Sequence, residues 1–113
     1  MVGRPILEHE KLILDFMCKE VASFNIIPEI PEFAYEMDDG GMGSVKFLEE
    51  THPPKKQVGS CSFKDKDGVL VICDLFLDGS GRISELSFWR VDFEPVNVFP
   101  TSVDELLTYP EDS

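Results

Sequence analysis

The N-terminal segment has the periodicity of an amphipathic helix. Between residues 4 and 24, apolar side chains recur at spacings of three and four residues, which places them on one helical face: Leu12, Ile13, Phe16, Met17, Val21 and Phe24. Pro5 fits the first turn of this helix, where a missing N–H costs nothing. Pro28 and Pro31 follow and impose an extended connection. The pattern therefore predicts one helix over residues 4–24.

From residue 33 onward, short apolar runs alternate with glycine, proline and aspartate, which is typical of β-strands. These runs predict strands over the ranges 33–37, 44–49, 58–65, 69–78 and 82–93. Asp67 and Gly68 predict a two-residue hairpin turn, and Ser102 with Glu105 has the capping-box pattern of a short closing helix. We expect a single α+β domain over residues 1–113, in which an N-terminal helix packs on an antiparallel β-meander of four to six strands, with a short C-terminal helix.

The expected turns also predict the register of the central strands. A two-residue turn at Asp67 and Gly68 places Phe63 opposite Ile72. A four-residue loop at 78–81 then leaves two apolar faces, one carrying Val71, Cys73, Leu75, Leu86 and Phe88, the other Phe63, Ile72, Phe76, Ile83 and Trp89. Either both faces are covered, or one of them is an interface.

This register places Asp74 directly opposite Glu85, and like charges across a strand pair are destabilising. Three explanations stay open at this point. The register is shifted by a bulge, a base such as Arg82 or Arg90 lies between the two acids, or the acids form a site.

The balance of charge limits the class of partner. The chain of 113 residues has a formal net charge of −12, from 22 acids and 10 bases. A protein binds nucleic acids or anionic membranes through Lys and Arg side chains, so the negative net charge argues against both kinds of partner. No base follows Arg90, but six acids do: Asp92, Glu94, Asp104, Glu105, Glu111 and Asp112. This C-terminal acidity either keeps the protein soluble or attracts a basic protein partner.

Localisation is predicted from two further features. No run reaches the roughly 18 apolar residues of a membrane span, and charged residues interrupt the N-terminus where a signal peptide needs an apolar core. The three cysteines, Cys18, Cys61 and Cys73, are odd in number and far apart, which suits reduced thiols better than a disulfide framework. We therefore expect a cytoplasmic protein.

Residues 36–47, with the sequence EMDDGGMGSVKF, carry the pattern closest to a site. A phosphate-binding loop needs a following helix, and an EF-hand needs acids at alternate positions, so neither pattern fits. Three glycines in four positions favour a tight turn with positive φ, although its amides could still bind an anion. The candidate binding residues of this turn are Asp38, Asp39, Gly40 and Gly41.

Patterns for metal or covalent chemistry are lacking. His9 and His52 lie in different segments, with no cysteine or carboxylate at the spacing of a zinc site. Neither histidine can be tied to a cysteine as an activating base. We therefore expect no metal site, no cofactor and no catalytic residue.

Residues 85–96, ELSFWRVDFEPV, form the densest aromatic stretch of the chain. Trp and Arg are enriched at binding hot spots, so the candidate binding residues here are Glu85, Trp89, Arg90, Asp92, Phe93 and Glu94. The alternative is structural: strand alternation buries Trp89 in a core while Arg90 pairs with an acid.

Four segments together resemble a known family: RPILEHEKLILDFM, EMDDGGMGSVKF, DGVLVICDLFLDGSGRISELSFWRVDFEPV and the final FP. The chain is similar to a family of small uncharacterised bacterial proteins, with a DGGMGS turn and an ELxxWKxDF strand, over Arg4 to about Pro100. Arg90 stands where that family usually has Lys, and Glu94 where Ser is common. The resemblance implies that the glycine turn and residues 85–93 are motif positions. In size and acidity the family is similar to immunity proteins of bacterial toxin systems.

The leading functional expectation is a non-enzymatic binding protein, an immunity protein that neutralises a bacterial toxin. The alternative is a small-ligand-binding or enzymatic domain with its site at the glycine turn, for which a pocket lined by Asp38, Asp39, Glu85 and Arg90 would be the sign. A third possibility is a homodimer that uses the second apolar face of the sheet.

Overall fold

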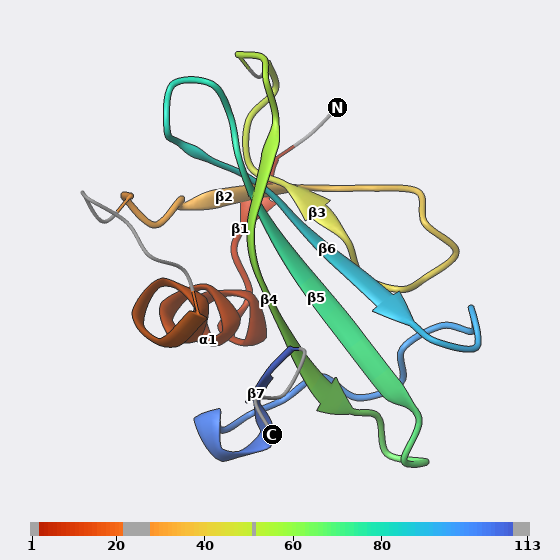
Figure 1. The fold of residues 1–113 in the computed structure, drawn as a ribbon. Helices are drawn as coiled ribbons and strands as arrows, with labels where there is room; N and C mark the ends of the chain where they lie inside the picture. Colours follow the sequence, from red (N-terminus) through yellow and green to blue (C-terminus); the bar gives the residue numbers. More distant parts are fainter. Residues whose placement is uncertain (1–2, 22–27, 51, 110–113) are drawn as a thin grey trace.

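The computed structural model of the protein describes residues 3–21, 28–50 and 52–109 (Figure 1). They form one α-helix and a seven-stranded antiparallel sheet with the order β1-β2-β3-β6-β5-β4-β7. The elements in chain order are β1 Arg4–Pro5, α1 Glu8–Phe16, a π-helical turn Met17–Val21, β2 Phe33–Glu36, β3 Val45–Lys46, β4 Lys56–Lys64, β5 Leu70–Leu77, β6 Ile83–Arg90, a 3₁₀ turn Val103–Glu105 and β7 Leu107–Thr108.

The helix starts later than its periodicity predicted. Arg4 and Pro5 form β1, which pairs with β2, so the placement of Pro5 in a first helical turn is wrong. Because β1 lies at the edge of the sheet, the missing N–H of proline is tolerated there. Glu10 caps the true start, since its carboxylate accepts the Leu7 N–H at 2.7 Å. The predicted end of the helix, residues 22–24, lies outside the described residues.

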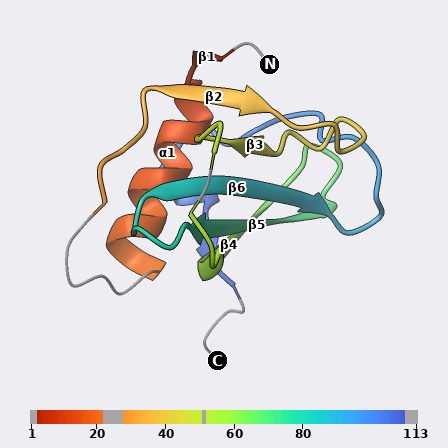
Figure 2. The same cartoon turned by 90° about the horizontal axis from the view of Figure 1, so that it is seen from above.

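The apolar face of α1 packs on one face of the sheet (Figure 2). Ile13, Leu14 and Met17 are fully buried there. The sheet side of this core includes the face predicted to receive the helix: Val71, Cys73, Leu75, Leu86 and Phe88, all buried. This part of the prediction is confirmed, because side-chain alternation along a strand survives a register error of two residues.

The register of the β4–β5 hairpin differs from the prediction by one residue. The loop holds three residues, since the Asp65 N–H donates to the Val69 carbonyl and Gly68 adopts a φ of 83°. Phe63 therefore lies opposite Val71 instead of Ile72. Because a one-residue slip exchanges the faces of a strand, Phe63 is buried on the helix side, contrary to its predicted place on the second face.

The register of β5 and β6 removes the predicted clash of acids. Asp74 lies opposite Ser87, and Glu85 lies opposite Phe76, two residues from the predicted pairing. A bulge between Phe76 and Leu77 then turns Ile83 onto the helix face, where it is buried. Glu85 instead forms an ion pair with Lys55 at 2.9 Å. The shifted-register explanation is therefore the one that holds.

The sheet has seven strands, more than the four to six predicted, and the closing helix is one 3₁₀ turn. The capping box itself is present, with Glu105 accepting the Ser102 N–H at 3.0 Å. Leu107 and Thr108 then pair with β4 as the edge strand β7. Since a single hydrogen-bonded turn gains little by itself, the pairing with β4 decides the conformation that follows it.

Candidate functional site

The predicted site residues lie in two neighbouring groups. Asp38, Asp39, Gly40 and Gly41 belong to the glycine turn, the loop between β2 and β3. Trp89, Arg90, Asp92, Phe93 and Glu94 lie at the end of β6 and in the turn that follows it. Glu85 stands apart from both groups, in mid-strand, paired with Lys55.

The glycine turn is a tight turn held from inside by Asp39. Gly40, Gly41 and Gly43 have φ values of 76°, 83° and 98°, so the predicted positive φ is confirmed. The carboxylate of Asp39 accepts the N–H groups of Met42 at 3.1 Å, Gly43 at 3.4 Å and Ser44 at 2.8 Å. Burial alone would raise the pKa of Asp39, but these bonds outweigh it and lower the pKa. Asp39 thus occupies three amides of the turn that an external anion could otherwise have used.

The glycine turn packs against the segment that follows β6. A β-carbon on Gly41 would lie 3.2 Å from Pro95, and one on Gly43 would lie 2.6 Å from the ring of Phe99. The Val96 N–H also donates to the Gly41 carbonyl at 3.3 Å. The glycines are therefore required for close approach as well as for φ, and they bring the two predicted groups together.

A cleft of about 250 Å³ lies between the glycine turn and the start of α1. The side chains that line it include Arg4, His9, Glu10, Asp38, Asp39 and Phe99. Arg4 donates to both oxygens of Glu10, at 3.0 and 2.8 Å, and His9 stacks on Phe99 with ring centroids 4.0 Å apart. Burial lowers the pKa of His9. Glu85 and Arg90 do not line this cleft, so it is not the pocket of Asp38, Asp39, Glu85 and Arg90 that would have been the sign of a ligand site.

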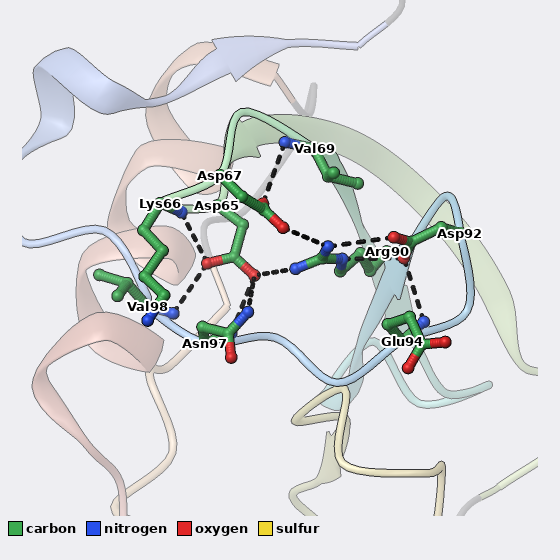
Figure 3. A network of polar contacts seen from close by, with 9 residues as sticks. All are labelled: Asp65, Lys66, Asp67, Val69, Arg90, Asp92, Glu94, Asn97 and Val98. Atoms are coloured by element: carbon green, nitrogen blue, oxygen red, sulfur yellow. Dashed lines mark hydrogen bonds and ion pairs between the residues drawn. The ribbon is translucent and has the colours of Figure 1, made fainter.

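Arg90 is the centre of the largest polar network in the described residues (Figure 3). Its guanidinium bonds to Asp65 at 2.7 Å, to Asp67 at 2.6 Å and to both oxygens of Asp92, at 2.8 and 3.0 Å. The side chain of Arg90 is 5% exposed and that of Asp65 is fully buried. The bonds to Asp92 and Asp67 raise the pKa of Arg90 above its ordinary value.

Asp65 joins this network to the segment behind it. Its carboxylate accepts the N–H groups of Lys66 at 2.7 Å, Asn97 at 2.8 Å and Val98 at 2.9 Å. Burial alone would raise the pKa of Asp65, but these bonds and Arg90 hold it well below its usual range. The β4–β5 turn, the end of β6 and residues 97–98 are thereby fixed to one another.

The turn after β6 presents an aromatic side chain to solvent. The Phe93 N–H donates to the Arg90 carbonyl at 2.8 Å, and the Glu94 N–H to Asp92 at 3.1 Å. Phe93 has a φ of 63°, which is strained for a bulky side chain, yet the residue is 69% exposed. The ring centroids of Trp89 and Phe93 lie 5.9 Å apart, and Trp89 as a residue is 40% exposed. The structural interpretation of this stretch placed Trp89 in a core and paired Arg90 with an acid. Its second half is confirmed, because Arg90 pairs with acids, but its first half is wrong, because Trp89 is not buried.

We call the rings of Trp89 and Phe93, together with the carboxylates of Asp67, Asp92 and Glu94, the acidic aromatic surface. Trp89 belongs to the sheet face opposite α1, in a row of paired residues that continues through Ile72 and Ser62 to Leu107. No described helix covers that face, and Val91, Leu107 and Tyr109 are exposed as well. Ile72 and Ser62, in the middle of this row, are buried, so the exposed apolar side chains lie at its two ends, Trp89 at one and Leu107 at the other.

Residues 3–100 match a family whose shared region is described as Domain of unknown function (DUF6984). The chain belongs to this family. No curated protein and no solved structure gives a significant match. The DUF6984 region contains the glycine turn, the Arg90 network and the acidic aromatic surface, whereas the 3₁₀ turn and β7 follow it.

Two properties of this DUF6984 chain bear on the kind of ligand. Within the described ranges, no group of three or more His, Cys, Asp or Glu side chains could hold a metal ion. None of the described helices is long and apolar enough to cross a membrane.

Sequence reasoning missed three members of the Arg90 network: Asp65, Asp67 and Asn97. In the sequence, Asp67 is explained by turn propensity alone, and Asp65 falls at the end of the strand predicted over residues 58–65. The signal that could have found them is the alternation of β6, which places Arg90 on the same face as Phe88. An arginine on a core-facing position needs carboxylates, and the acids of the adjacent hairpin turn were the nearest source.

Proposed function

We propose that this DUF6984 protein is a non-enzymatic binding protein that takes a basic protein partner on its acidic aromatic surface. The observation that carries the proposal is Phe93, which combines a strained left-handed backbone with a largely exposed ring. Strain of this kind persists only where the surroundings enforce it, and it concentrates at functional positions. A solvent-exposed ring gains little for folding, so binding is the better reason for it.

The surface has the composition of a binding hot spot. Trp89 and Phe93 supply large apolar area on short side chains, and the network behind them fixes the turn before a partner arrives. Asp67 and Asp92 remain 45% and 39% exposed beside Arg90. A rigid aromatic centre with an acidic margin complements a basic partner, and the net charge of −12 would speed the encounter.

Within this class, neutralisation of a bacterial toxin is the function we favour. The resemblance in size and acidity to immunity proteins supports it, as does an interface that needs no catalytic group. The acids that follow Arg90 in the chain are not equally available to attract a partner, because Asp92 is bound to Arg90 and Glu105 caps the 3₁₀ turn. Glu94 and Asp104 are the exposed acids of this set that are best suited to steering a partner.

A second candidate is binding of a small molecule in the cleft beside the glycine turn. Its volume of about 250 Å³ and the stacked pair of His9 and Phe99 favour it. It ranks second because the polar groups of the cleft already bond to one another: Arg4 to Glu10, and Asp39 to the amides of its own turn.

The test is capture of the partner with two matched variants. The protein, Phe93→Asn and Phe33→Asn are immobilised in parallel and exposed to a lysate of the organism that encodes the chain, first at low and then at moderate salt. Phe33 is a suitable control because it is 52% exposed but lies on β2, toward the other edge of the sheet. We expect a basic protein bound by the native chain and by Phe33→Asn, and lost with Phe93→Asn.

The captured protein is then expressed with and without this chain, and relief of growth inhibition is measured. Relief that depends on Phe93 supports the immunity function. Equal capture by all three forms, or a bound small molecule with no protein at low salt, would exclude the acidic aromatic surface as the functional site.

A further inference from the structure

We infer that the protein has a separate ligand site, a pocket between β4, β5 and β7 that takes a small neutral molecule made of one aromatic ring and one hydroxyl group. The pocket lies on the sheet face opposite α1, at the other end of the row of paired residues that begins with Trp89. It is distinct from the acidic aromatic surface and from the cleft beside the glycine turn, so the inference does not depend on the proposed function.

Strand pairing builds this pocket. Ser62 of β4 lies opposite Leu107 of β7, and Lys64 of β4 lies opposite Leu70 of β5. Ser62 and Lys64 are two residues apart on one strand, so their side chains share the face opposite α1. The Tyr109 N–H donates to a β4 carbonyl at 3.1 Å and so keeps the chain beyond β7 against the same strand. The pocket has a volume of about 230 Å³, and its lining includes Ser62, Lys64, Leu70, Glu105, Leu107 and Tyr109.

Ser62 supplies the polar group that a ligand would meet. The residue is only 2% exposed, yet its hydroxyl forms no hydrogen bond with any described residue. Ser60, two positions earlier on β4, differs in this respect, because its hydroxyl bonds to Gln57 and Asp74. Buried polar groups of folded proteins nearly always have a hydrogen-bond partner. A buried hydroxyl that lines a pocket and has no partner in the described chain is therefore available to bond with a ligand.

The rest of the lining favours an uncharged, apolar ring. Leu70, Leu107 and Tyr109 provide apolar walls, and Leu107 and Tyr109 are 48% and 40% exposed, so a ligand that covers them buries apolar surface. The two charged side chains of the lining, Lys64 and Glu105, have opposite signs and cancel. The carboxylate of Glu105 is also engaged already, because it accepts two backbone N–H groups, at 2.8 and 3.0 Å.

The volume of the pocket sets the size of the ligand. An apolar cavity of about 150 Å³ binds benzene, so about 230 Å³ leaves room for one aromatic ring and a short substituent. A simple phenol combines the required parts, since its ring contacts the leucine side chains while its hydroxyl bonds to Ser62. Glu105, Leu107 and Tyr109 follow the DUF6984 region, so half of this lining lies outside the part of the chain that the family shares.

The test is a titration of the isotope-labelled protein, followed through its amide chemical shifts, with p-cresol, toluene and benzoate. Toluene lacks the hydroxyl of p-cresol, and benzoate carries a charge. We expect p-cresol to shift the amides of Ser62, Leu70 and Leu107 with a Kd at least about threefold below that of toluene, because one hydrogen bond changes an affinity by roughly two- to tenfold. Benzoate should bind more weakly than p-cresol, since the lining has no net charge to offset the lost hydration of a carboxylate.

Three variants assign the binding to this pocket. Ser62→Ala removes a hydroxyl without a described partner, so it should fold normally and lose the advantage of p-cresol over toluene. Ser87→Ala is the matched control, because Ser87 lies on the same face of the sheet but does not line the pocket, and it should keep that advantage. Leu107→Asn removes part of the apolar wall and should weaken both ligands alike.

Three results would overturn the inference: equal Kd values for p-cresol and toluene, an advantage of p-cresol that survives in Ser62→Ala, or benzoate bound more tightly than p-cresol. Chemical-shift changes confined to the cleft beside the glycine turn would also contradict it, because they would place the ligand on the other side of the molecule's candidate sites. Phe93→Asn should bind p-cresol as the native chain does, so loss of partner capture in that variant leaves this inference intact.

Discussion

Gly43 lies against the ring of Phe99, so closely that a β-carbon on Gly43 would come within 2.6 Å of that ring. Phe99 in turn stacks on His9 and contacts Phe88 edge to face, at centroid distances of 4.0 and 5.5 Å. The glycine turn is thus part of the packing between α1 and the segment that follows β6.

Substitution of Gly43 should therefore cost more than substitution of its neighbours. We expect Gly43→Ala to lower the free energy of unfolding by at least about 2 kcal/mol, because it adds both a left-handed backbone penalty and a clash with Phe99. Gly40 has a similar φ but nothing within 4 Å, so Gly40→Ala should cost only about 1 kcal/mol. Urea denaturation measures both, and equal losses would contradict the packing argument.

The Arg90 network should dominate thermal stability. Arg90→Leu leaves the buried carboxylate of Asp65 without its cation, and we expect the Tm to fall by roughly 10 °C or more. The control is Lys55→Leu, which removes an ion pair whose lysine is 46% exposed, and its Tm should change by about 3 °C or less. Similar shifts for both variants in calorimetry would show that the network is not a stabilising anchor.

Acid should weaken the fold through the same network. The folded pKa of Asp65 lies below the value of about 3.9 for an unfolded aspartate, so the unfolded chain binds the proton more readily. The contribution of Asp65 is therefore complete above about pH 5 and is lost as the pH falls below about 4. Asp65→Asn should be less stable at pH 7 but lose less stability on acidification. Asp104→Asn, at an exposed position, should follow the native curve. Parallel curves for Asp65→Asn and the native chain would contradict the assignment.

Phe93 should be dispensable for folding. Asn tolerates the left-handed region better than Phe, and the ring of Phe93 is mostly exposed, so Phe93→Asn should change the free energy of unfolding by less than about 1 kcal/mol. Phe63, which is 2% exposed, provides the contrast: Phe63→Ala should cost about 3–5 kcal/mol. A large loss in Phe93→Asn would mean that the ring serves the fold rather than a partner.

Several features follow from local sequence alone. The periodicity of residues 12–17 places Ile13 and Met17 on a buried helical face, and strand alternation selects Val71, Cys73 and Leu75 for the core. The positive φ values at Gly40, Gly41 and Gly43 follow from a cluster of glycines between two strands. In each case the information lies within a few residues of the position concerned, so no distant contact is needed to predict it.

Other features depend on partners far away in the chain. The length of the loop at Gly68 decides whether Phe63 faces the helix, because one residue added to the loop exchanges the two faces of the strand. Pro5 became part of a strand only because β2 lies beside it, and Leu107 only because β4 does. Trp89 stays 40% exposed at the end of a row in which Ile72 is buried, while Arg90 is buried where Asp65 and Asp67 meet it from the adjacent hairpin. Alternation along a strand determines which side chains share a face, but whether that face meets a core, a carboxylate or solvent is decided by long-range contacts that no local pattern records.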